Sequence, residues 1–337
     1  MNGNTWPSRR RFIGITAAGA GLALLPLAFH GRAASGATSA EPVVWRGVAL
    51  GADALLQIHH PDRALAERLV DRSIAEVHRL ERVFSLYRDD SAISSLNRDG
   101  VLTDPPADLV RLLGDSEQFS RLTAGAFDVT VQPLWLLYAE HFGTLNADPD
   151  GPSAAARAAA LSRVGHDRIA IDERAIRLDP GMAVTLNGIA QGYITDRVAE
   201  LLLNSGIERA LVDMGETRAL GDSPSGAPWR IGIEDPAAPD RIAETVNLRS
   251  TAIATSGGYG TMFDAAGRFN HIFDPKTGRT SSRYASVSVI APLAGTADAL
   301  STAFSLMPLD RTQAIVTQLG LTAHFTLPDG AHLVQSV

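Results

Sequence analysis

The sequence predicts an α+β protein with a mixed, largely antiparallel sheet and flanking helices. Stretches with helical periodicity and short β-type runs follow one another in mixed order, whereas a doubly wound parallel sheet would need strict alternation. About 300 residues remain after the N-terminal segment, which is enough for one large core. The 337 residues contain no cysteine, so disulfides and thiolate metal sites are excluded. We predict one domain over residues 41–337.

The first 40 residues have the layout of a twin-arginine export signal. Ser8-Arg9-Arg10-Arg11-Phe12-Ile13 precedes an Ala/Gly-rich run over 14–29, and small residues crowd 33–40. The run is too short and too rich in glycine for a good membrane span. We therefore predict that residues 1–40 are a twin-arginine signal with its cleavage region and that the protein is periplasmic. The alternatives are an ordinary secretory signal or an uncleaved anchor.

The charge of the chain argues against nucleic acid as a partner. The formal net charge is -7, and residues 1–33 contribute four arginines and no acid, so a chain starting at Ala34 carries -7 - 4 = -11. Nucleic-acid-binding domains are basic or carry a basic stripe.

Helices and strands follow from the spacing of apolar residues. Between Asp62 and Phe84 these recur every three or four positions, which predicts an amphipathic helix of about six turns. Shorter helices are predicted over 107–122, 154–160 and 192–203, the last stopping at Gly206. The β-type runs are 168–171, 210–213, 229–234, 245–248, 252–255, 271–274, 285–290 and 321–326.

Two segments offer groups that suit a flat polar ligand. The first runs from Phe84 to Asn97, is predicted to be a loop, and carries Tyr87, whose ring could stack on a ligand or be half-buried at a helix end. The second is Gly125-Ala126-Phe127-Asp128, in which a lone carboxylate lies among apolar neighbours. A buried Asp needs a partner, and more often it is a structural hydrogen-bond acceptor than a ligand contact.

A glycine turn before a helix could bind an anion. In Leu186-Asn187-Gly188-Ile189-Ala190-Gln191-Gly192-Tyr193 the glycines allow close backbone approach, and the N-terminus of the following helix presents N–H groups and the positive end of its dipole. Alone, a glycine pair before a helix is weak evidence of phosphate binding.

Hydroxyl groups and a histidine follow in the next polar segments. Thr255-Ser256-Gly257-Gly258 precedes Asn270-His271-Ile272-Phe273-Asp274-Pro275-Lys276. These groups suit a site that handles a phosphate and a proton, although a His at the start of a β-type run is usually structural.

Asp298 and Thr302 are candidate metal ligands. They stand four apart in a stretch of good helix formers, so a helix would place the carboxylate and the hydroxyl on one face. Both are hard oxygen donors of the kind that Mg²⁺ takes. A helix cap or a solvated face is the alternative.

Taken in order, these segments resemble the ApbE family of FAD:protein FMN transferases over nearly the whole chain after the signal. The matching motifs are Phe-Ser-x-Tyr with Leu-Asn, Gly-x-Phe-Asp, Gly-Ile-Ala-x-Gly-Tyr, Thr-Ser-Gly, His-Ile-x-Asp-Pro-x-Thr-Gly and Asp-Ala-Leu-x-Thr. The resemblance implies a single ApbE-type domain related to the T-fold. It also implies a Mg²⁺-dependent transfer of FMN from FAD to a Thr or Ser hydroxyl of a partner through a phosphoester bond, with release of AMP.

The resemblance also assigns roles to individual residues. It implies that the Asp298 carboxylate, the Thr302 hydroxyl and the Ala190 carbonyl bind Mg²⁺. Tyr87 would face the isoalloxazine ring, and the other FAD contacts would be Asn97, Asp128, Gly188, Gln191, Asp213, Ser256 and His271. Two positions depart from the family pattern: Gln191 replaces the usual Lys, and Glu216 stands where a second Gly is common.

His271 is the best candidate for the base that takes the hydroxyl proton, because its unperturbed pKa is closest to working pH; Asp298 is the second predicted catalytic residue. Two rival functions remain, a Mg²⁺-dependent FAD pyrophosphatase giving free FMN and AMP, and a non-catalytic flavin-binding accessory protein for a respiratory complex. A carrier needs neither the Asp298 and Thr302 pair nor His271. The predicted partner is an acceptor flavoprotein of a membrane electron-transfer complex.

Overall fold

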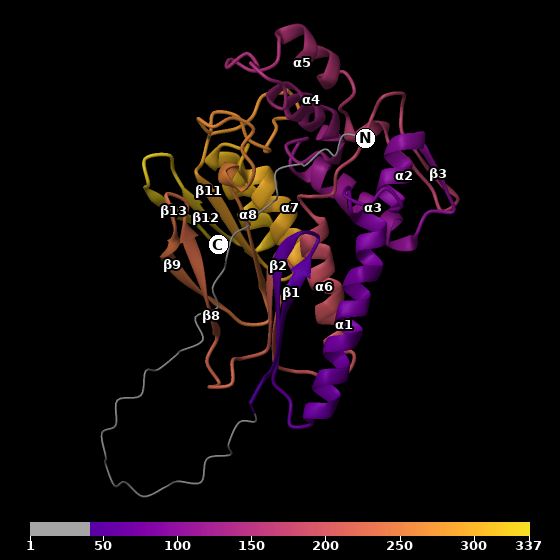
Figure 1. Ribbon diagram of the computed structural model, residues 1–337. Coiled ribbons are helices and arrows are strands. Elements are labelled where there is room, and N and C mark those ends of the chain that lie inside the picture. The colour runs from indigo at the N-terminus through magenta and orange to yellow at the C-terminus, as the bar shows by residue number, and fades with distance from the viewer. Residues whose placement is uncertain (1–40) are drawn as a thin grey trace, which may run out of the picture.

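An eight-stranded antiparallel sheet is the centre of the fold in the computed structural model, which describes residues 41–337 (Figure 1). The strand order is β1-β2-β6-β7-β10-β11-β12-β13, and every neighbouring pair is antiparallel. The predicted fold class is confirmed, whereas the predicted export signal lies outside the described residues. The strands are β1 (Val43–Ala49), β2 (Ala52–Ile58), β6 (Ala210–Asp213), β7 (Thr217–Leu220), β10 (Ala252–Ser256), β11 (Ser286–Ala291), β12 (Thr322–Thr326) and β13 (His332–Gln335).

Two smaller sheets complete the β structure. One contains β3 (Val101–Thr103), β5 (Ala175–Arg177) and β4 (Ala170–Ile171), and the other is the ribbon of β8 (Trp229–Asp235) and β9 (Ala238–Leu248). The ribbon packs on the large sheet through a separate apolar cluster that includes Leu211 and Ile253. Their neighbours Val212 and Ala254 belong to the main core, as expected for strands whose side chains alternate between faces.

Helices cover the other face of the sheet. α1, α6 and α7 run along it, and α7 contacts β10 and β11 while α6 contacts β7 and α7 (Figure 1). Among residues 41–337, none of the helices has both the length and the hydropathy needed to cross a membrane. The helices are α1 (Arg63–Phe84), α2 (Ala92–Asp99), α3 (Ala107–Leu122), α4 (Gln132–Phe142), α5 (Ala154–Leu161), α6 (Ala190–Leu203), α7 (Ala294–Phe304) and α8 (Leu309–Leu319), with 3-10 turns η1 (Val129–Val131), η2 (His166–Arg168) and η3 (Gly258–Gly260).

The long N-terminal helix forms as its periodicity predicts. The Asp62 side chain caps α1 by accepting a hydrogen bond of 2.9 Å from the Leu65 N–H, and Leu69, Val77 and Leu80 are buried. The predicted helices at 107–122, 154–160 and 192–203 are also confirmed, although α6 starts two residues early at Ala190.

Two local predictions are wrong. The loop predicted over 84–97 contains α2, because the Ser91 hydroxyl accepts a hydrogen bond of 3.1 Å from the Ser94 N–H and starts a helix. Residues 271–274 form no strand and share only a single bridge, between Phe273 and Thr280. Here the Asn270 side chain accepts from the Ile272 N–H at 2.9 Å and donates to the Ser281 carbonyl at 2.7 Å, which holds the chain in a loop.

Candidate functional site

A cavity of about 120 Å³ lies where the start of α6, the end of β10, α7 and the loop at His271 meet. Most residues predicted to handle the nucleotide and metal line it, although they come from segments up to 174 positions apart (Asp128 to Thr302). Those predicted residues are Asp128, Gly188, Gln191, Ser256, His271, Asp298 and Thr302.

A close contact between α6 and α7 positions Asp298 in the lining of the cavity. A Cβ on Gly192 would lie 2.4 Å from the Ala294 carbonyl oxygen, so only glycine allows the two helices this close. Across this contact the Gly192 N–H donates a hydrogen bond of 3.0 Å to Oδ2 of Asp298. One N–H group at the start of α6 is therefore used by the carboxylate of Asp298, which benefits from the helix dipole there.

Asp298 is buried, with 3% of its surface exposed. Burial raises its pKa to about 7, and the negative charge of Asp196 acts in the same direction, while the hydrogen bond from Gly192 opposes both. A carboxyl group in this environment gains from a neighbouring cation, because the cation replaces the proton as the balancing charge.

Three hydroxyl groups gather beside Asp298. The Ser256 Oγ at the end of β10 lies 2.8 Å from the Ser301 Oγ and 3.2 Å from the Thr302 Oγ1 on α7. A Cβ on Gly188 would come within 2.9 Å of the Thr302 Oγ1, so the glycine turn and this hydroxyl lie against each other. The two segments that the sequence suggested for phosphate and metal are thus in contact.

His271 borders the same cavity and is held by the neighbouring backbone. Its Nδ1 lies 3.3 Å from the Thr261 carbonyl oxygen, and its own N–H donates to that oxygen at 3.1 Å. A carbonyl oxygen only accepts, so this contact assigns the proton of the neutral ring to Nδ1 and makes Nε2 the basic nitrogen.

The sequence reasoning did not identify Glu216 as a cavity residue. It lines the cavity and is buried, and its pKa is raised well above the usual value by burial first and then by the charges of Asp298 and Asp213. Gln191 also lines the cavity and packs against Gly215. The described residues that line the cavity include neither Lys nor Arg. No arginine there takes the place of the family's usual Lys, at whose position this chain has Gln191.

Asp128 has the structural role that a lone buried carboxylate suggests. Its Oδ1 accepts hydrogen bonds from the N–H and the Oγ1 of Thr130 at 2.8 and 2.5 Å, and its Oδ2 accepts from the His166 N–H at 3.1 Å. It therefore shapes the cavity wall by fixing the chain around η1.

Four predicted residues do not line the cavity. Tyr87 is 59% exposed, and Asn97 forms a paired contact with the Val184 backbone at 2.7 and 2.8 Å. Asp213 accepts from the Gly215 N–H and the Thr217 hydroxyl, both at 3.0 Å, and Ala190 is buried in the first turn of α6. Their predicted roles toward flavin and metal stay predictions.

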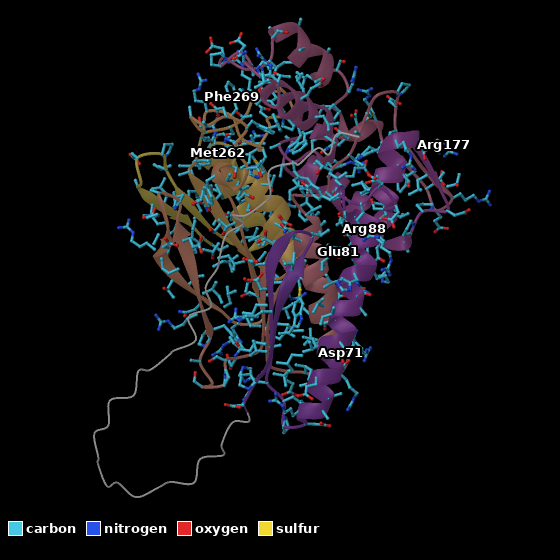
Figure 2. All side chains as sticks on the ribbon, in the orientation of Figure 1. Asp71, Glu81, Arg88, Arg177, Met262 and Phe269 are labelled. Atoms are coloured by element: carbon cyan, nitrogen blue, oxygen red, sulfur yellow. The ribbon has the colours of Figure 1, made fainter. Side chains whose placement is uncertain are left out.

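An aromatic cluster builds part of the cavity wall. Trp135 and Phe273 line the cavity, and behind them the Tyr138 ring lies 5.1 Å from Phe273 and 5.8 Å from Phe269. Phe269 is seen close to α4 and α5 in Figure 2. The cluster joins α4 to the segment that carries His271.

The sequence matches known transferases over most of its length. Residues 50–325 match the model of the ApbE family. A protein of Vibrio cholerae named FAD:protein FMN transferase is 36% identical over 255 residues, covering 73% of this chain and 74% of the relative. A protein of Klebsiella pneumoniae with the same name is 30% identical over 283 residues, covering 80% and 79%.

Solved structures agree with the sequence comparison. The structure of an ApbE protein from Thermotoga maritima superposes with a TM-score of 0.79 at 28% identity, covering 88% of this chain and 97% of that one. The flavin transferase ApbE from Vibrio cholerae gives a TM-score of 0.74 at 29% identity, covering 88% and 97%. The named relatives, together with the shared fold, thus define an enzyme of the transferase class. The chain belongs to the ApbE family.

Proposed function

We propose that this protein transfers FMN from FAD to a Ser or Thr hydroxyl of a partner protein and releases AMP. Membership of a family whose relatives are named FAD:protein FMN transferases supports flavin transfer. The observation that carries the finer proposal is the convergence of Asp298, Thr302 and His271 on one cavity.

The proposed reaction is a single displacement at phosphorus. The acceptor oxygen forms a bond to the FMN phosphorus, and the bond from that phosphorus to the bridging oxygen breaks, so that the bridging oxygen leaves with AMP. The hydroxyl proton passes to Nε2 of His271, the nitrogen left basic by the contact of Nδ1 with Thr261.

The donor set suits Mg²⁺. Among residues 41–337 no group of three or more His, Cys, Asp or Glu side chains is arranged to hold a metal ion. Mg²⁺ does not need one, since it is commonly held by one or two carboxylates together with substrate phosphates and water. Asp298 and Thr302 would hold it, with Ala190 offering its carbonyl. When bound there, Mg²⁺ supplies positive charge that the side chains around the cavity lack.

We also propose that the enzyme acts in the periplasm on an electron-transfer flavoprotein of a membrane complex. The periplasmic location rests on the twin-arginine pattern in the first residues, and the choice of partner rests on the resemblance to the ApbE family.

The function is tested by incubating the purified protein with FAD, Mg²⁺ and an acceptor subunit of an Rnf-type electron-transfer complex. Mass spectrometry should find one FMN on a Ser or Thr of the acceptor, together with AMP in equal amount. Free FMN and AMP formed at the same rate without acceptor would support the pyrophosphatase instead. Bound FAD with no AMP would support the non-catalytic carrier.

A further inference from the structure

A groove of about 330 Å³ lies beside the catalytic cavity and shares a wall with it. The shared wall is the segment 257–262. Gly257, Gly260 and Thr261 line the cavity, whereas Gly258, Tyr259 and Met262 line the groove. The two hollows are therefore separated by one thickness of chain.

Gly260 is the point at which the shared wall lies against His271. A Cβ there would lie 3.1 Å from Cε1 and 3.7 Å from Nε2 of His271. Gly260 does not have a left-handed backbone conformation, so its φ does not require glycine. Its missing side chain instead allows the His271 ring to lie directly against the backbone of the shared wall.

The lining of the groove suits an uncharged extended peptide. Small residues from four segments line it, namely Ala237, Gly258, Ser282 and Gly330, so a backbone can approach closely. Met262, which is 53% exposed, adds apolar surface to this lining.

Charge in the groove argues against a nucleotide. Asp235 is the only charged residue among the described ones that line it, and its carboxylate is paired with Arg241. A phosphate group would find no cationic partner in this lining, whereas a segment with small and hydroxyl side chains would lose little by entering it.

We propose that this groove receives the segment of the acceptor protein that carries the reacting hydroxyl. The segment lies extended over the small residues and crosses Gly260, which brings its Ser or Thr oxygen to Nε2 of His271. The inference rests on the proposed function, because it assigns that function's second substrate to a surface.

The first test obstructs the groove without touching the cavity. Ser282 is exposed and lines only the groove, so Ser282→Trp fills it from the solvent side. Ser225→Trp is the matched control, because Ser225 is exposed in the turn between β7 and β8 and lines neither hollow. With FAD saturating, we expect Ser282→Trp to raise the KM for the acceptor at least tenfold and to leave FAD affinity within twofold, whereas Ser225→Trp should change neither. An unchanged KM for the acceptor in a folded Ser282→Trp protein that binds FAD would show that the groove does not receive the acceptor.

A second test does not depend on turnover. The natural chain has no cysteine, so Ser282→Cys and Ser225→Cys each accept one maleimide-linked benzophenone. After illumination with the Rnf-type acceptor subunit, we expect a cross-linked product from position 282 and none from 225. A cross-link at 282 without any FMN transfer would support the groove as the acceptor-binding surface and contradict the proposed function. FMN transfer without that cross-link, or the absence of both, would contradict the groove as the acceptor-binding surface.

Discussion

The Gly192 N–H donates a hydrogen bond of 3.0 Å to Oδ2 of Asp298 and so joins the first turn of α6 to α7. The same carboxylate is the proposed metal ligand, which means that removing the whole side chain would disturb structure and chemistry together. Asp298→Asn separates the two, because its amide oxygen still accepts from Gly192 while the negative charge is lost.

We expect Asp298→Asn to lose FMN transfer while keeping its fold. Transfer should fall at least about 100-fold, because a bound metal ion supplies several kcal/mol of charge stabilisation. The thermal midpoint should stay close to that of the natural protein. Transfer is measured by flavin fluorescence of the acceptor on a gel over a Mg²⁺ series. If Asp298→Asn transferred FMN at the natural rate in the presence of EDTA, Asp298 would not be a metal ligand.

The affinity for Mg²⁺ should depend on pH. Burial raises the pKa of Asp298 to about 7 in the metal-free protein, so the carboxyl is protonated below that pH and must lose its proton to bind a cation. The Kd for Mg²⁺ should therefore rise about tenfold for each pH unit below 7 and level off above it. Titration calorimetry between pH 5.5 and 8.5 measures this, and a flat profile would contradict the assignment.

His271→Ala should slow the chemical step and spare substrate binding. We expect kcat to fall by about 10²- to 10⁴-fold, the usual effect of removing a placed base, with little change in FAD affinity. His78→Ala is a suitable control, since His78 is exposed on α1 and does not line the cavity. Single-turnover kinetics with preloaded FAD gives the rate, and an unchanged rate would exclude His271 as the base.

Gly192→Ala should destabilise the protein and reduce activity. The new methyl group would meet the Ala294 carbonyl oxygen at 2.4 Å, and backbone cannot rotate away as a side chain can, so we expect a loss of about 1–3 kcal/mol. Gly114→Ala has open space inside α3 and should instead gain about 0.5–1 kcal/mol. Urea unfolding of both variants measures the difference, and equal stabilities would mean that α6 and α7 separate easily.

Asp213→Asn should change how stability depends on pH. Burial raises the folded-state pKa of Asp213 to about 6, above the ordinary value of 3.8, so its contribution to stability is full below pH 3.8 and is lost as pH rises through 6. A shift of about two units corresponds to about 3 kcal/mol. Because Asn cannot ionise, the unfolding free energy of the variant should rise by that amount relative to the natural protein between pH 4 and 7. The unfolding free energies of both proteins are measured by urea titration at each pH. A difference between them that stays constant from pH 4 to 7 would contradict the prediction.

The sequence predicts most of the helices and the strands that lie in the buried sheet, because these have clear apolar periods. It misses the β1–β2 hairpin for a local reason. Leu50 and Gly51 both have positive φ, 47° and 81°, as a type I′ turn requires. The first position of such a turn is usually Asn, Asp or Gly, so a Leu there does not indicate a turn. Strand β7 is too short to show a period.

The residues of the candidate site also differ in how far the local sequence indicates them. Asp298, Thr302 and His271, which line one cavity, could be proposed from the sequence because their chemistry and motifs are local. Glu216 has no local signal, since its place in the cavity depends on how β6 and β7 meet α6. The contact of Asn97 is equally hidden from the sequence, because its amide binds the Val184 backbone 87 positions away and no spacing rule encodes such a contact.

The aromatic cluster behind Trp135 connects two distant parts of the chain, α4 and the segment around Phe269 and Phe273. It packs on its own, apart from the main core that holds the helices to the large sheet. Loosening of these rings would therefore open the substrate pocket while circular dichroism still reported an intact sheet. Warming the enzyme should abolish catalysis in a first stage and melt the scaffold only in a second.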